Sequence, residues 1–317
     1  MEENDFFNTP ILFITFNRMD TTIKVFQKIR EQKPKKLYLA SDGAREAKVG
    51  ESKKVEEIRN YLIKSIDWEC EVKTLFQPKN LGCKFGTHNA ITWLFENEER
   101  GIIIEDDCLP SNSFFSYCET LLKRYKNDQR IFTISGFNYA SDLVNSRESY
   151  FFAKFPMIWG WATWRDRWHA NLQVIENFEE IQNTQLVNSV THDHAVSRMI
   201  IDNVKLSIEN KVDVWDYIWV YTNFINNAVS TVPAKNLVEN IGYGPEATHT
   251  VGVANDQLIP AVEMQCDCTA PSVILPQNSY DNHLYKDLYN WKSFPEKIAD
   301  PTHFFKVLKS RILVKLF

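Results

Sequence analysis

Three consecutive acidic residues, Glu105, Asp106 and Asp107, directly follow the apolar run Gly101-Ile-Ile-Ile104. Carboxylates at the end of a buried strand repel one another and resist leaving water unless a cation holds them. Mg²⁺-type sites suit this pattern, because they use one or two protein carboxylates and take further oxygens from substrate phosphates. The triplet therefore predicts that Mn²⁺ or Mg²⁺ binds here together with a diphosphate.

The same acids have an alternative interpretation as the start of a helix expected over 114–125. Asp107 precedes that helix, and Ser111 or Asn112 could cap it instead. Short polar side chains at such positions accept hydrogen bonds from the first N–H groups of a helix. In that case the triplet would lie on an ordinary surface loop and need no ligand.

The elements that position these acids follow from a regular alternation of patterns over the first 135 residues. Apolar runs predict strands at 11–16, 36–40, 72–76, 101–105 and 131–135. Between them, apolar residues recur at helical spacing over 20–30, 52–66, 82–97 (a loop, then a helix) and 114–125. Strands that alternate with amphipathic helices form βαβ units, which predicts an α/β fold with a mainly parallel sheet flanked by helices.

Polar residues and glycines collect at the carboxyl ends of these expected strands. They are Asn17-Arg18, Ser41-Asp42-Gly43, Asn80-Leu81-Gly82, Glu105-Asp106-Asp107 and Gly136-Phe137-Asn138. In open α/β sheets, ligands bind outside the carboxyl ends of the strands. We therefore expect the functional site at this edge of the sheet.

After residue 140 the alternation fades. A polar loop over 141–149 precedes an aromatic cluster, Trp159-Gly-Trp-Ala-Thr-Trp164. The patterns that follow indicate helices at 176–203 and 214–227, a strand at 229–232, an ordered loop at 234–250 and an irregular segment at 255–300.

In order and spacing, these motifs resemble the GT-A fold glycosyltransferases, which use nucleotide-diphosphate sugars. The similarity is greatest to the family of the inverting GlcNAc-transferase that begins complex N-glycan branching, together with its uncharacterised bacterial relatives. It rests on Glu105-Asp-Asp-Cys-Leu-Pro-Ser-Asn-Ser-Phe-Phe-Ser-Tyr117, Ser135-Gly-Phe-Asn138, Asn17-Arg18 with Ser41-Asp42, and Trp215-Asp216. It covers roughly residues 9 to 250 and departs from the family in the acceptor half, so it does not identify the acceptor.

The resemblance implies a role for each residue at the donor site. Asp107 would bind the metal, Asp106 the ribose, and Glu105 a hydroxyl of the donor sugar. Asp42 would accept a hydrogen bond from the base, which favours uracil and hence a UDP-sugar. Arg18 would face the diphosphate, although it could equally be a solvated arginine at a helix start.

Two further basic positions could contact the phosphates. Lys84, or alternatively His88, follows the loop Asn80-Leu-Gly82 that would lie above the nucleotide. His249 lies in a loop after Gly242 and Gly244, where a neutral imidazole could bind the metal or donate to a phosphate. An ordinary surface histidine is the alternative for His249.

Transfer with inversion needs a carboxylate that deprotonates the acceptor hydroxyl opposite the leaving diphosphate. The resemblance assigns this general base to Asp216, and Asp213, three residues earlier, is the alternative. Either aspartate could also be a helix N-cap. For Trp159 and Trp161 we expect a wall for the acceptor, because sugar C–H faces pack on aromatic rings; a core cluster is the alternative.

The chain as a whole is expected to adopt the GT-A fold in three parts. Residues 1–140 would form the nucleotide-sugar-binding half, 141–255 the acceptor and catalytic half, and 256–317 an extension. The extension would end in a basic amphipathic helix, where apolar residues recur over 301–317 at spacings of three and four among four basic residues. Such a helix could dock on anionic lipid or pack on protein.

Composition excludes several other classes of protein. The formal net charge is −5 and charged residues make up 24% of the 317 residues, which argues against disorder and against a nucleic-acid-binding protein. The sequence has neither a signal-peptide pattern at its start nor about 18 consecutive apolar residues, so we expect a cytoplasmic protein, with the inner face of a membrane as its only membrane contact.

The sequence therefore predicts an inverting, metal-dependent transfer of sugar to a glycan or lipid-linked acceptor, in bacterial surface polysaccharide assembly. A nucleotidyltransferase is disfavoured because Phe16-Asn-Arg-Met-Asp20 lacks the glycines usual in its phosphate loop. A non-catalytic sugar-binding module would explain the tryptophans but not the acids.

Overall fold

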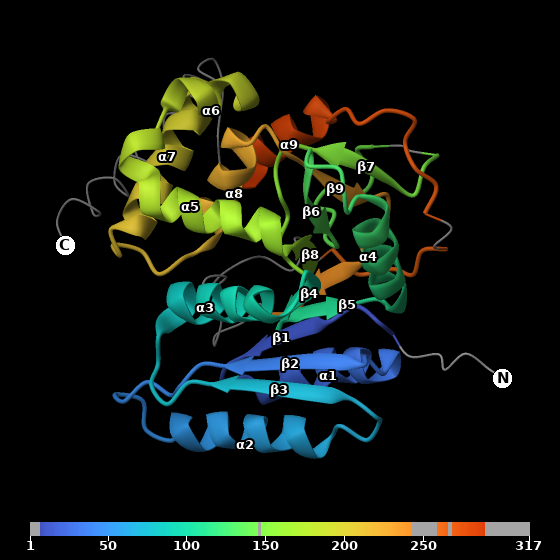
Figure 1. Ribbon diagram of the computed structural model, residues 1–317, viewed down its shortest axis with the longest axis vertical. Coiled ribbons are helices and arrows are strands. Elements are labelled where there is room, and N and C mark those ends of the chain that lie inside the picture. Colours follow the sequence, from blue (N-terminus) through green and yellow to red (C-terminus); the bar gives the residue numbers. More distant parts are fainter. Residues whose placement is uncertain (1–6, 145–146, 243–258, 266–267, 289–317) are drawn as a thin grey trace.

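The computed structural model describes residues 7–144, 147–242, 259–265 and 268–288. Its centre is an eight-stranded sheet in the order β3-β2-β1-β4-β8-β6-β9-β7 (Figure 1). These strands are β1 Ile11–Thr15, β2 Lys36–Ser41, β3 Glu71–Phe76, β4 Arg100–Glu105, β6 Ile131–Ser135, β7 Tyr150–Ala153, β8 Trp161–Trp164 and β9 Val229–Pro233. β1 to β4 are parallel, whereas β8 pairs antiparallel with both β4 and β6, and β7 pairs antiparallel with β9.

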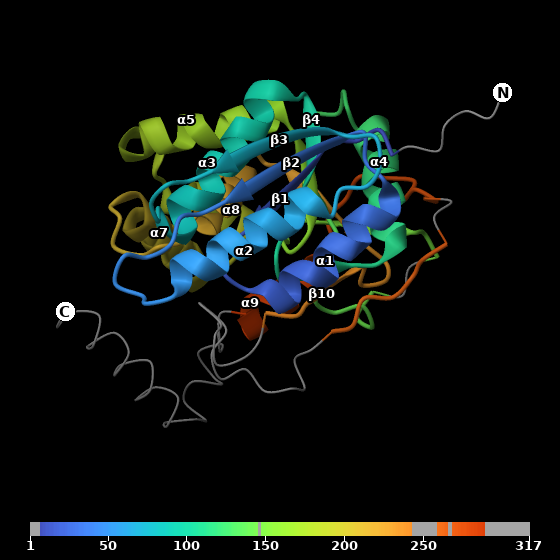
Figure 2. The ribbon, with the colours of Figure 1, turned by 90° about the horizontal axis from the view of Figure 1, so that it is seen from below.

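Helices cover both faces of this sheet, as the alternating patterns predict. The first five helices are α1 Met19–Gln32, α2 Glu51–Lys64, α3 Gly82–Asn97, α4 Asn112–Arg124 and α5 Arg165–Ile181. Buried residues of α1, α2 and α4 share one core with one side of the strands, and those of α3 share another core with the opposite side. Figure 2 shows α1 and α2 on one side of β1–β3 and α3 on the other.

The second part of the chain adds a helical layer beside the far end of the sheet (Figure 1). It comprises α6 Thr184–Thr191, α7 His194–Ile208, α8 Asp216–Ile225 and α9 Asn278–Leu288. Apolar residues of these helices pack with β7 and β9 in a core of their own. A small antiparallel pair, β5 Cys108–Pro110 with β10 Val238–Asn240, brings the second part back beside the acid triplet.

The fold confirms the predicted α/β class and the order of elements over the first 135 residues. Several elements differ from expectation. The aromatic cluster contains strand β8, β7 follows the polar loop, and α9 lies in the segment expected to be irregular. Strand β5 was not expected, β10 lies in the loop expected at 234–250, and the helical segment expected at 176–203 is three helices that begin at Arg165. β8 was not recognised because its four residues are buried on both faces, so no alternation of polar and apolar residues marks it. The amphipathic helix expected at 301–317 lies outside the described residues.

One sheet serves both expected halves, since β8 is inserted between β4 and β6. The division at residue 140 stays a prediction. Within the described residues, no helix is both long and apolar enough to cross a membrane.

Candidate active site

A cavity of about 530 Å³ opens at the carboxyl ends of β1, β2 and β4, where the strand-end residues predicted a site. Its volume lies in the range that small-molecule ligands occupy. From the first part of the chain its wall includes Phe16, Asn17, Ala40, Ser41, Asp42, Arg45, Leu75, Gln77, Asn80, Cys83 and Thr87, together with Arg18 and the acid triplet. From the second part it includes Ile158, Trp159, Asp213, Val214, Trp215, Asp216 and Tyr217.

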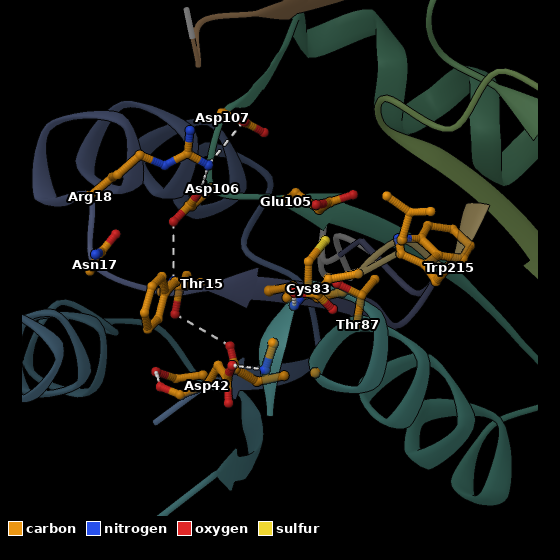
Figure 3. Close-up of a pocket in the computed structure, with 18 of the residues that line it drawn as sticks. Thr15, Asn17, Arg18, Asp42, Cys83, Thr87, Glu105, Asp106, Asp107 and Trp215 are labelled. Carbon is orange, nitrogen blue, oxygen red and sulfur yellow. Dashed lines mark hydrogen bonds and ion pairs between the residues drawn. The ribbon is translucent and has the colours of Figure 1, made fainter. Parts of the chain in front are cut away.

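Arg18 is the cation that faces the acid triplet (Figure 3). Its Nη2 atom lies 2.5 Å from Asp106 Oδ1 and 2.9 Å from Asp107 Oδ2. Asp106 also accepts a hydrogen bond from the Phe16 N–H at 3.1 Å, so it is fixed from two sides. The alternative of a solvated Arg18 is wrong, because its side chain is only 22% exposed and is held at the acids.

Glu105 differs from the two aspartates in its partners. Its half-buried side chain lines the cavity, and in the described part of the chain no group donates a hydrogen bond to it. Burial raises the pKa of Glu105, and the carboxylates of Asp107 and Asp106 raise it further. Burial likewise raises the pKa of Asp106, although Arg18 opposes the shift. A ligand that offers hydroxyl donors or a cation would satisfy Glu105.

The helix-capping interpretation of the triplet is wrong. α4 begins at Asn112, and its first N–H groups, those of Asn112 and Ser113, donate to the distant Glu263 carboxylate at 2.8 Å each. Glu263 therefore caps α4, and Asp107 is free of that role. The Asp107 carboxylate points instead to Arg18, with the Cys108 thiol 3.6 Å from its other oxygen.

Asp42 lies in the cavity wall, but its carboxylate is occupied by its own chain. It accepts hydrogen bonds from Asn80 Nδ2 and from the N–H groups of Gly43, Leu81 and Gly82, at 2.8 to 3.1 Å. A carboxylate has about four acceptor positions, so none is left for the base of a nucleotide. The structure thus replaces the role that the resemblance implied: Asp42 shapes the loop that leads into α3.

Asp216 and Asp213 both line the cavity and have different partners. Asp213 accepts hydrogen bonds from the N–H groups of Cys83 at 2.9 Å and Lys84 at 2.8 Å, so it caps α3. Asp216 is the first residue of α8, half-buried, with the Tyr217 N–H 2.9 Å from its Oδ1. Its charge contributes to the raised pKa of Glu105, which lies within electrostatic reach of it.

Lys84 and Trp161 do not reach the cavity, in contrast to their expected roles. The Lys84 ammonium is buried between helices and donates to the Ser207 carbonyl and to Asn210 Oδ1. Trp161 is fully buried, because β8 lies within the sheet and its ring stacks on Trp215 at 5.8 Å. His88, the alternative to Lys84, packs on Trp168 at 5.3 Å and is also absent from the cavity wall.

Trp159, in contrast, lines the cavity, packed edge-on against Phe137 at 4.6 Å between ring centroids. Its location agrees with a wall for a sugar, and its role stays a prediction. The expected metal ligand or phosphate donor His249 lies outside the described residues.

Sequence reasoning missed several residues of this wall. Arg45 lies over the ring of Phe16, with its Cζ atom 5.3 Å from the centroid, and is held there by the buried Glu51. Glu51 also accepts from Asn17 Nδ2 at 2.8 Å, which ties the 43–50 loop to the β1–α1 loop. Phe16 could have been predicted as a cavity residue from its position at the end of β1, but nothing in the local sequence indicates that Arg45 lines the cavity.

The acid triplet offers few ligands for a divalent cation. Among the described residues, no three side chains of the ligating types cluster at coordinating distance. Magnesium-type ions that bridge to phosphates need only one or two carboxylates, which Asp107 with its neighbours can supply. The oxygen ligands here therefore fit an ion that takes most of its coordination from a diphosphate and water.

Comparison with known proteins gives distant similarities only. No protein-family model matches the chain, and no characterised protein matches its sequence. Among solved structures, the chain is similar to the mannosyltransferase PcManGT of Pyrobaculum calidifontis, solved with GDP-mannose and Mn²⁺ (12% identity, 51% of this chain, 45% of that chain, TM-score 0.36). It is also similar to HddC of Yersinia pseudotuberculosis (10%, 50% and 78%, TM-score 0.31) and to a UDP-glucose pyrophosphorylase solved with UDP-glucose (13%, 51% and 78%, TM-score 0.31).

The chain spans less than half the length of the mannosyltransferase, and each similarity extends over about half of this chain. The particular resemblance to the N-glycan-branching GlcNAc-transferases stays a prediction. Any functional assignment has to rest on the side chains of the cavity itself.

Proposed function

We propose that the chain is an inverting, metal-assisted glycosyltransferase that moves a sugar from a nucleotide diphosphate to a hydroxyl of a glycan or lipid-linked acceptor. The observation that carries the proposal is the grouping of Glu105, Asp106 and Asp107 at the end of a buried strand, in the floor of a ligand-sized cavity that Asp216 also lines. Clustered acids, a cation and a further carboxylate are the groups that such a transfer requires.

The donor would lie along the cavity from Phe16 to Glu105. The ring of Phe16 under Arg45 offers a flat platform for a base, and Arg18 offers a guanidinium to phosphate oxygens. Because Asp42 has no acceptor position left, nothing in this wall selects uracil through it, and UDP is the first donor nucleotide to test rather than the assigned one. Glu105 would accept hydrogen bonds from hydroxyls of the donor sugar.

Asp107 would hold Mn²⁺ or Mg²⁺, which would neutralise the charge that develops on the leaving diphosphate. Arg18 pairs with the same carboxylate, so it would turn toward the phosphates as they bind. Asp216 would take the proton of the acceptor hydroxyl as its oxygen attacks the anomeric carbon and the bond to the diphosphate breaks on the opposite side. Trp159 would support the acceptor.

A screen of nucleotide-diphosphate sugars for hydrolysis, with the Asp216→Asn variant beside the wild type, tests this proposal. The amide fills the same space but cannot accept a proton, so we expect kcat to fall by roughly 10²–10⁴-fold with the donor Kd unchanged. Asp202→Asn, at an exposed position of α7, is the matched control and should behave as wild type.

Three results would contradict the proposal. Equal turnover in Asp216→Asn and wild type would remove the base assignment. Pyrophosphate formation from a nucleoside triphosphate and a sugar phosphate would make the protein a nucleotidyltransferase. Metal-independent sugar binding without any turnover would make it a binding module.

A further inference from the structure

The cavity is completed by two segments that are far apart in the sequence. One is the beginning of α3, and the other is the α7–α8 loop, residues 209–215, which leads directly into Asp216. Cys83 and Thr87 come from the first segment, and Asp213 and Trp215 from the second. Asp216 directly follows the second segment and lines the same cavity as the acid triplet.

Asp213 joins the loop to α3 through the helix backbone. Its two oxygens accept the N–H groups of Cys83 and Lys84, which the helix itself leaves unpaired, and no side chain of the N-cap residue competes for them. Gly82 makes this approach possible: its φ is +81°, and a Cβ there would lie 2.7 Å from Asp213 Oδ2. A negative charge at this end of α3 is also favoured by the helix dipole.

Lys84, whose N–H takes part in the first connection, makes the second connection through its side chain. Its ammonium is buried and bonds to the Ser207 carbonyl and, at 2.8 Å, to Asn210 Oδ1. Ser207 in turn donates from its hydroxyl to the carbonyl of Val214 at 2.5 Å. A buried ammonium is costly unless such acceptors surround it, so the loop and the lysine stabilise each other.

The two connections are reciprocal. Asp213 of the loop caps the beginning of α3, and Lys84 of α3 caps the end of α7. We propose that Lys84 and Asp213 are positioning residues, which hold the α7–α8 loop on α3 so that Asp216 faces the donor cavity. The role of Asp216 in this statement rests on the proposed function. The hydrogen bonds of Lys84 and Asp213 are a property of the fold and can be tested without an enzymatic assay.

Lys84→Met keeps the apolar stem and removes the ammonium, and Asp213→Asn replaces the negatively charged cap by a neutral amide. Hydrogen exchange would be measured for the amides of residues 83, 84, 210 and 211, and kcat and KM for the donor selected by the screen. In Lys84→Met we expect residues 83 and 84 to exchange about tenfold faster or more, although the ammonium bonds to neither amide. We expect kcat to fall by roughly 10- to 100-fold with an unchanged donor KM, because the base is displaced rather than removed.

Lys211→Met is the matched control, since Lys211 lies in the same loop but its exposed ammonium pairs with Glu209, 2.6 Å away at the surface. It should leave exchange and turnover as in wild type. Unchanged hydrogen-exchange rates of these amides in both Lys84→Met and Asp213→Asn would show that the two side chains do not hold the loop on α3. Faster exchange with unchanged kcat would overturn the positioning role.

Failure of the proposed function has a different signature. If no nucleotide sugar is turned over by the wild type, the exchange measurements still decide whether the loop is held by Lys84 and Asp213. If Asp216→Asn is fully active while the two variants loosen the loop and lower kcat, the loop positions another group and the base assignment alone is wrong.

Discussion

At the scale of single residues, two tryptophans of one short motif have opposite environments. Trp159 lines the cavity, whereas Trp161, two positions later in β8, is fully buried among Trp168, Trp215 and Trp219. Alternation along the strand does not separate them by itself, because Gly160 has a φ of +62° and turns the chain between them. The same motif therefore contributes one ring to the site and one to the core.

This difference predicts different effects of truncation. Trp161→Ala should lower the free energy of unfolding by about 3–5 kcal/mol, because it opens a cavity where the ring is fully enclosed. Trp159→Ala should change stability far less and raise the acceptor KM instead. Urea denaturation of both variants, with acceptor kinetics, checks the pair. A stable Trp161→Ala variant with a raised acceptor KM would reverse the assignment.

The acid triplet and Arg18 could be predicted because each directly follows a strand whose apolar run is visible in the sequence. The partners of Asp42, Asp213 and Lys84 could not be predicted in this way. Asp213 and Lys84 contact each other's segments across about 130 residues of sequence, and Asp42 contacts the start of α3 across about 40, and no local pattern records such contacts. The charged side chains of Asp42, Asp213 and Lys84 made them candidates for the site, but their residue type alone did not indicate what they contact.

At the level of secondary-structure elements, α9 is a helix that the sequence pattern did not predict. Residues 278–288 are mixed in character, and the helix is stabilised by contacts with β7 and the residues after it. Asp281 is buried, and its carboxylate accepts the N–H groups of Lys154 and Phe155 at 3.0 to 3.1 Å. Burial raises the pKa of Asp281 to about 6, although these hydrogen bonds oppose the shift.

This shift predicts a pH dependence with a definite sign. Between about pH 4 and pH 6 the unfolded chain has lost this proton while the native Asp281 retains it, so the stability that the residue contributes falls as the pH rises. Asp281→Asn does not titrate. Relative to wild type, its free energy of unfolding should therefore rise by about 2 kcal/mol from pH 4 to pH 7.

Urea denaturation of both proteins at pH 4, 5, 6 and 7 measures this difference. A difference that stays constant across the series would show that Asp281 titrates normally.

The parallel strands and their helices were predicted because each has a periodicity of its own. β7 and β8 were missed since they are four residues long, buried throughout and placed by pairing with strands distant in the sequence. Such strands are indistinguishable, by pattern alone, from apolar loop residues. Boundaries of the parallel strands and of the helices between them agree within about two residues, as with the strand expected at 101–105 and found at Arg100–Glu105. The helical segment expected at 176–203 instead corresponds to α5, α6 and α7, which begin at Arg165 and end at Ile208.

At the scale of the whole molecule, the decisive feature is that one sheet carries the acid triplet while β8 and β10 return the second part of the chain to it. Residues of both parts of the chain therefore line the cavity. The expected cytoplasmic location, and membrane docking through 301–317, stay predictions, since that segment lies outside the described residues.

We propose that the acid triplet binds the diphosphate of a nucleotide through a divalent cation. Calorimetric titration of UDP and GDP into wild type and Asp107→Asn, each with Mn²⁺ and with EDTA, tests it most directly. We expect the wild type to bind one of these nucleotides more than about tenfold more tightly with Mn²⁺, and the variant to lose that gain, because its amide is a poor ligand for a hard cation. An Asp107→Asn variant that binds the nucleotide with Mn²⁺ as tightly as wild type does would contradict the account.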